Sequence, residues 1–177
     1  CNVLDYVNID YHLRDFNDVI EARGFSEIRL HPCSDDFGGI GNGFGFPVRF
    51  KLEVSDDPGF KSSTLVADQT ADDYPNLGIA YYAAAKDVTG RYIRLTATKL
   101  YDRNGSPMFA MSELQALSAE GTNLALNKVV SSSTSIEAPA RWARKNLTDG
   151  KWPTPKDVAK TQQWAEQKDW KWRAMPI

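Results

Sequence analysis

Gly90–Leu117, GRYIRLTATKLYDRNGSPMFAMSELQAL, is the stretch that decides the fold of this chain. Apolar and polar side chains alternate from Tyr92 to Leu100, and Met111–Leu117 forms a second β-prone run. The turn-rich segment Asp102–Pro107, which contains an Asn-Gly dipeptide, separates the two runs. Two β-prone runs around an Asn-Gly break predict an antiparallel strand pair.

Pro47–Val54 shows the same alternation in its strictest form, which predicts a half-buried antiparallel strand. Further short strands are expected at 25–31, 64–67 and 79–83, and a helical turn or two at 15–23, closed by Gly24. Many short strands separated by Gly, Pro, Asp and Asn predict an all-β, jelly-roll-like antiparallel β-sandwich. The core residues expected from the alternation are Phe50, Leu52, Ile93 and Leu95.

Length and charge exclude several classes of protein. The chain has 177 residues, enough for one sandwich or for one domain and part of another. A formal net charge of -2 gives no electrostatic argument for a nucleic-acid partner. No apolar run reaches the roughly 20 residues that span a bilayer, so we expect no transmembrane segment.

The tryptophans divide the chain, because all five lie after residue 141 and the first 120 residues contain Phe and Tyr instead. This shift predicts a β-sandwich over residues 1–120 and a change of unit near residue 121. Residues 121–177 then either begin a second unit or supply strands that complete the first.

Four segments resemble the discoidin-type, galactose-binding-like family. Residues 91–94 (RYIR) and the apolar-x-Glu-apolar run around Glu113 are similar to its closing strands. Residues 123–134 resemble its opening strand, and residues 141–150 resemble the W-x-x-x-x-L-x-D-G element that follows it. The resemblance implies a galactose-binding-domain-like sandwich. In such modules residues like Asp149 and Glu113 help to hold a structural calcium, for which hard carboxylate ligands are suited.

The chain as a whole also resembles the accessory region of bacterial α-L-rhamnosidase-like glycoside hydrolases. The segments that carry this likeness are 28–32, 43–50, 54–57, 71–75, 92–98 and 138–142. The resemblance implies a non-catalytic carbohydrate-binding module, located outside the cytoplasm beside a catalytic domain of the same parent chain. The alternative is a structural spacer or protein-interaction module that binds no glycan. Cys1 is compatible with a lipoprotein start, with a Cys1–Cys33 disulfide or with neither.

Two groups of residues are candidates for glycan contacts. The first is the glycine-rich loop 38–45, since loops at the ends of a sandwich often bind ligands; its polar candidates are Asp35, Asp36 and Asn42. The second is a late set of indoles, Trp164, Trp170 and Trp172, since a pyranose ring stacks its C–H face on an indole. Trp142 is expected in the core.

No catalytic constellation is apparent in the sequence. A glycosidase needs two carboxyls roughly 5–10 Å apart across a sugar. The adjacent pairs Asp35-Asp36, Asp56-Asp57 and Asp72-Asp73 are better explained as turn formers, because neighbouring side chains point apart. Neither His12 nor His31 accompanies a nucleophile motif. We therefore expect no enzymatic activity in this fragment.

Overall fold

The computed structural model describes residues 8–12, 23–35 and 40–153, and this part of the chain is all β with no α-helix. Its only helices are two 3₁₀ turns, η2 (Ala140–Trp142) and η3 (Arg144–Thr148), and neither is long or apolar enough to cross a membrane. The strands are β1 (Asn8–His12), β2 (Arg23–His31), β3 (Cys33–Asp35), β4 (Gly41–Phe44), β5 (Arg49–Ser55), β6 (Thr64–Gln69), β7 (Tyr81–Gly90), β8 (Tyr92–Lys99), β9 (Tyr101–Arg103), β10 (Ser106–Met108), β11 (Glu113–Leu117) and β12 (Val129–Ser132).

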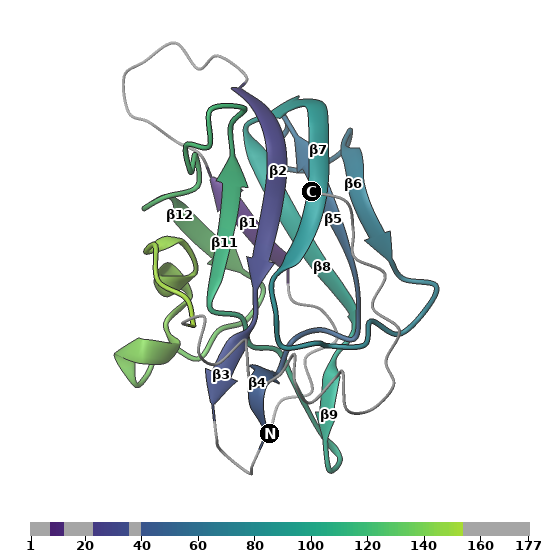
Figure 1. The fold of residues 1–177 in the computed structure, drawn as a ribbon, viewed down its shortest axis with the longest axis vertical. Helices are drawn as coiled ribbons and strands as arrows, with labels where there is room; N and C mark the ends of the chain where they lie inside the picture. Colours follow the sequence, from purple (N-terminus) through teal and green to yellow (C-terminus); the bar gives the residue numbers. More distant parts are fainter. Residues whose placement is uncertain (1–7, 13–22, 36–39, 154–177) are drawn as a thin grey trace.

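The strands form several small antiparallel sheets. The largest has the order β12-β1-β8-β5-β6, and a second has the order β11-β2-β7. The pairs β3-β4 and β9-β10 are separate hairpins. In Figure 1 the three-stranded sheet lies in front of the five-stranded one, and the two hairpins lie together at the lower end.

Side chains of both larger sheets form one hydrophobic cluster. Phe50, Leu52, Ile93 and Leu95 are each 0% exposed, which confirms the core predicted from the alternation of β5 and β8. The three-stranded sheet contributes Ile28, Leu30 and Leu114 to the same cluster. The prediction of an antiparallel, β-rich fold is therefore confirmed.

The strand pair expected around the Asn-Gly dipeptide was predicted with the wrong partners. Asn104 and Gly105 have φ values of 52° and 81° and close only the short β9-β10 hairpin. β8 instead pairs with β1 and β5, while β11 pairs with β2. Asn-Gly turns favour positive φ and a tight hairpin, so the dipeptide specified its local turn but not the partners of the longer strands.

The helix expected over residues 15–23 lies mostly outside the described residues, but its end was predicted incorrectly. β2 already begins at Arg23, and Gly24 is inside that strand, where it pairs with Thr89 of β7. Gly24 therefore does not terminate a helix, and tertiary pairing with β7 determines the conformation there.

Residues 123–153 pack against both larger sheets. β12 pairs with β1 at the edge of the five-stranded sheet, and η3 contacts β11. Ala125, Val130 and Leu147 of this segment belong to the shared hydrophobic cluster. Whether residues 121–177 begin a second domain stays a prediction.

Truncation of Phe50 tests the core. Its ring makes edge contacts with Phe46, Tyr74 and Tyr81 at centroid distances of 5.0–5.8 Å. We expect Phe50→Ala to lower the free energy of unfolding by about 3–5 kcal/mol because of the cavity it leaves. Leu65→Ala on β6, where the side chain is 53% exposed, is the control and should change it by less than about 0.5 kcal/mol. Equal losses in chemical denaturation would contradict this assignment of the core.

Candidate functional site

The outer face of the three-stranded sheet carries the polar and aromatic side chains of greatest interest. Ile28 and Leu30 of β2 are 0% exposed and point into the core. Because side chains alternate along a strand, Glu27, Arg29 and His31 point to the opposite face. Their register partners on β11 are Leu117, Gln115 and Glu113, and Tyr82 of β7 lies beside Arg29.

The segment from Ala143 to Trp152 lies against β11 and β12 through η3. Within this segment, Leu147 and Thr148 of η3 are buried. The Thr148 hydroxyl donates to the Lys128 carbonyl at 2.8 Å, and the Asn127 amide donates to the Thr148 carbonyl at 2.7 Å. These bonds join the end of η3 to the residues that precede β12.

Glu113 is the buried acid that this turn encloses. The residue is 0% exposed, and its Oε1 accepts a hydrogen bond from the Gly150 amide at 3.2 Å. Its Oε2 has no hydrogen-bond partner among the described residues. Gly150 has a φ of 80°, and a Cβ there would lie 3.1 Å from Leu126 Cδ1, so the turn requires glycine.

Burial raises the pKa of Glu113 to about 8, and the negative charge of Asp149 contributes in the same direction. Hydrogen bonds from the backbone amides of Gly150, Asp149 and Lys151 act the other way without compensating for burial. An isolated buried carboxylate is costly, so the Glu113 carboxyl is largely protonated at neutral pH unless a positive charge accompanies it.

Glu113 and Asp149 are the two residues that the sequence proposed as calcium ligands, and the structure brings them together. The buried Glu113 Oε2 without a partner suits a hard cation, which prefers oxygen ligands, whereas the Asp149 carboxylate accepts a hydrogen bond from the Lys151 backbone amide at 3.0 Å and lies 3.6 Å from the Lys151 ammonium. Among the described residues no three His, Cys, Asp or Glu side chains converge on one point. Backbone carbonyls or water would therefore supply the remaining ligands.

Trp152 follows this turn directly and stacks on His31. The two ring centroids are 4.8 Å apart, and the planes are tilted by 32°. Nε2 of His31 lies 3.0 Å from Oε1 of Gln115, which fixes the imidazole against β11. Burial lowers the pKa of His31, and the positive charge of Arg29 contributes to the same shift. The indole thus rests on a neutral ring and remains 45% exposed.

Arg29 and Tyr82 extend this arrangement across β2 to β7. The Arg29 guanidinium lies over the Tyr82 ring, 5.3 Å from its centroid, and its Nε donates to the Glu27 carboxylate. Tyr82 is 48% exposed. We call Trp152, His31, Arg29 and Tyr82 the planar row.

The sequence analysis missed the planar row because it considered His31 only as a catalytic residue and named only Trp164, Trp170 and Trp172 as stacking candidates. The signal present in the sequence is the alternation of Glu27, Arg29 and His31 with Ile28 and Leu30, which identifies the outward face of β2 but not the aromatic residues beside it. Trp142, expected in the core, is 51% exposed, so that prediction was wrong. Trp142 lies in a short 3₁₀ turn with no buried residue.

The glycan contacts expected elsewhere are only partly described. Asn42 accepts a hydrogen bond from the Ser34 hydroxyl at 2.6 Å across the β3-β4 hairpin, and Asp35 ends β3. Neither belongs to the planar row. Asp36, Trp164, Trp170 and Trp172 lie outside the described residues.

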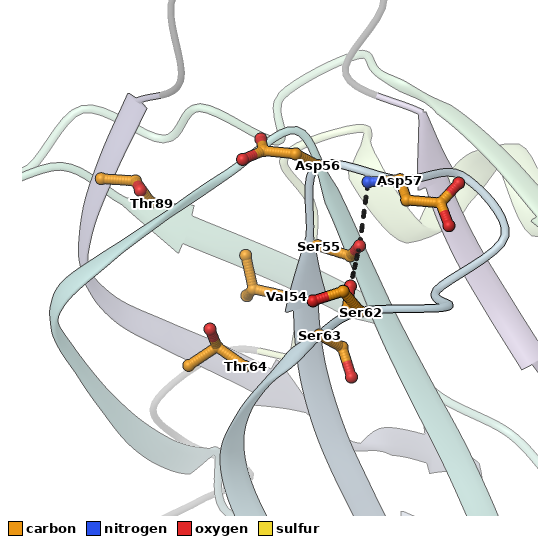
Figure 2. Close-up of a pocket in the computed structure, with 8 residues that line it drawn as sticks. All are labelled: Val54, Ser55, Asp56, Asp57, Ser62, Ser63, Thr64 and Thr89. Atoms are coloured by element: carbon orange, nitrogen blue, oxygen red, sulfur yellow. Dashed lines mark hydrogen bonds between the residues drawn. The ribbon is translucent and has the colours of Figure 1, made fainter.

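A polar hollow of about 230 Å³ lies between the β5-β6 turn and Thr89 of β7 (Figure 2). Ser55 and Asp57, which line it, form hydrogen bonds within the turn itself. The Asp57 amide donates to Ser55 Oγ, and the Asp57 carboxylate accepts from the amides of Gly59 and Lys61. The side chains of Asp56 and Asp57 point away from each other in Figure 2. Since none of the described residues that line the hollow is aromatic, they offer no stacking surface for a sugar.

Two further groups are poorly placed for chemistry. The Glu113 carboxyl is fully buried, so with Asp149 it cannot enclose a glycosidic bond. Cys33 has a free thiol in the structure, and Cys1 lies outside the described residues; burial raises the pKa of Cys33 to about 12. A thiol in that state is a poor nucleophile at neutral pH.

Comparison of the chain with protein-family models, curated proteins and solved structures finds no match.

The raised pKa of Glu113 predicts a specific pH dependence. The unfolded chain loses this proton near pH 4.5 and the folded chain near pH 8, so folding binds a proton between these values. The stabilisation from Glu113 is present below about pH 4.5 and is lost as the pH rises to about 8. In chelator-containing buffer, the free energy of unfolding measured by urea denaturation should fall less with rising pH for Glu113→Gln than for the wild type. Parallel pH curves for the two proteins would contradict the buried-acid assignment.

If Glu113 and Asp149 bind calcium, calcium should restore the stability that the folded protein loses as the pH rises toward 8. A ligand at 100 times its dissociation constant stabilises the folded state by about 2.7 kcal/mol. We therefore expect the melting temperature to rise by several degrees in calcium, with a much smaller rise in Glu113→Gln. Asp72→Asn is the matched control, because Asp72 is an exposed acid, and it should respond like the wild type. An equal response in Glu113→Gln would exclude this site.

Proposed function

We propose that this chain is a non-catalytic carbohydrate-binding accessory module with a jelly-roll-like, galactose-binding-domain-like β-sandwich fold. In this proposal it belongs to an extracytoplasmic polysaccharide-degrading protein of α-L-rhamnosidase-like type and binds glycan beside a catalytic domain of the same parent chain. The antiparallel sheets and their common hydrophobic cluster support the fold. The sequence resemblance supports the enzyme context.

The exposed indole of Trp152 is the observation that carries the proposal. Stacking on His31, together with the neighbouring bond between His31 and Gln115, supports the ring on one side. Its exposed fraction, 45%, leaves surface for the apolar C–H face of a pyranose. A supported aromatic side chain with nearby polar groups is typical of a sugar site, since little conformational entropy is lost on binding.

A protein-interaction module is the second candidate function, and it also has an observation in its favour. Besides Trp152, four large apolar side chains of residues 123–153 are exposed: Leu126, Val129, Ile136 and Trp142. Exposed apolar surface often marks protein contacts. These side chains therefore make Trp142 the natural comparison for Trp152.

Glycan binding should depend on Trp152 and not on Trp142. We expect the wild type to bind galactose- or rhamnose-containing oligosaccharides with a Kd of roughly 0.1–1 mM, a net binding free energy of about 4–5.5 kcal/mol, because one stacked ring and a few hydrogen bonds that compete with water contribute little. Trp152→Ala should weaken this at least about tenfold, a loss of about 1.4 kcal/mol. A glycan array followed by calorimetric titration of the best ligand measures both.

Trp142→Ala is the matched control, because it removes an indole of similar exposure (51%) from η2. It should bind like the wild type. Absence of binding at tens of millimolar ligand, or equal loss in the two variants, would favour the module that binds no glycan.

A further inference from the structure

Tyr82 and Arg29 form a second flat surface on the same sheet face as Trp152. His31 and Arg29 are two residues apart on β2, about 6.8 Å along the strand, and Tyr82 pairs with Arg29 on the next strand, about 4.8 Å across. Combining the two gives about 8 Å between the backbone positions of His31 and Tyr82. That separation is longer than one pyranose ring.

Tyr82 is held in place from one side, as Trp152 is. The Arg29 guanidinium lies over its ring, and the Glu27 carboxylate holds that guanidinium in turn. Ala84, the register partner of Glu27 on β7, is exposed and small, so its side chain does not project far from the sheet beside Tyr82. Among the described residues, β7 is an edge strand of its sheet.

The composition of this face favours a neutral glycan over other occupants. The positive charge of Arg29 is paired with Glu27, which removes the excess charge that a nucleic acid or an acidic polymer would need. The polar side chain of Arg29, paired with Glu27, lies between the positions of His31 and Tyr82. A protein interface usually has a contiguous apolar centre, whereas a sugar chain presents C–H faces and hydroxyls in alternation.

We propose that the planar row is a two-platform site for a linear, neutral oligosaccharide, with one sugar on Trp152 and another on Tyr82. Arg29 lies between the backbone positions of His31 and Tyr82 and binds hydroxyls of the intervening chain. The inference rests on the proposed function, which needs only the Trp152 platform. It adds the direction of the glycan, from the β11 side toward β7, and a minimum length of two to three sugars.

The length of the oligosaccharide distinguishes a two-platform site from a site with Trp152 alone. The probes are galactose with its linear oligomers up to galactotetraose, and rhamnose with the corresponding rhamno-oligosaccharides. For the wild type we expect affinity to increase at least about tenfold from monosaccharide to trisaccharide and then to level off. Tyr82→Ala should lose this increase with glycan length. Tyr82→Phe should keep it, because stacking needs the ring and not the hydroxyl.

Tyr82→Leu is a second truncation that retains an apolar, strand-compatible side chain, and Trp142→Ala is the control outside the row. The melting temperature of each variant establishes that it is folded. Length-dependent binding that is lost in both Tyr82→Ala and Tyr82→Leu, and kept in Trp142→Ala, supports the site.

Three outcomes overturn the inference. If the oligosaccharides bind but length has no effect, or the Tyr82 truncations behave like the wild type, the inference fails and the proposed function stands. If no glycan binds, both fail. If sedimentation shows self-association that Tyr82→Ala abolishes, the face is an interface between copies of this chain.

Discussion

The enclosure of Glu113 by the turn at residues 149–151 is the contact on which the outer side of the three-stranded sheet depends. A carboxyl group at 0% exposure needs hydrogen-bond donors, and the backbone amide of Gly150 supplies one at 3.2 Å. The same turn brings Asp149 beside Glu113 and leads directly to Trp152. A single buried acid therefore connects the packing of the segment 143–152 with the position of the exposed indole.

The planar row is a consequence of the same periodicity that builds the core. On β2 the residues Ile28 and Leu30 must face inward, because burial of their apolar surface stabilises the fold. The period of two then places Arg29 and His31 on the outer face, in register with Tyr82 and Glu113. A shift of one residue in the register would exchange the two faces, so the core determines which side chains can form the row.

Sequence patterns predicted the elements whose information is local. The alternation around Phe50, Leu52, Ile93 and Leu95 identified the buried face correctly. The Asn104-Gly105 turn was located, but its strands were paired incorrectly, because pairing of β8 and β11 is set by contacts distant in sequence. Trp142 was placed in the core because size and hydrophobicity alone favour burial, and nothing local indicates that its 3₁₀ turn lies outside.

The proximity of Glu113 and Asp149 was within reach of sequence reasoning only through the resemblance, since 36 positions separate them. The planar row was outside its reach altogether. Its four members come from β2, β7 and the segment after η3, and no local pattern connects these elements. What the sequence did contain was the polar alternation of β2, which identifies an outward face but not what covers it.

The position of the turn implies that its two neighbours are energetically linked. Residues 149–151 contact Glu113 on one side and continue into Trp152 on the other. If both the calcium prediction and the proposed sugar site on Trp152 hold, a cation that binds the Glu113 carboxylate orders the turn. A sugar stacked on Trp152 then benefits from the same order. Linkage is reciprocal, so a sugar that orders the turn must strengthen cation binding by the same factor. The Glu113 acid would then act on glycan affinity without touching the glycan, because its effect passes through the backbone of three residues.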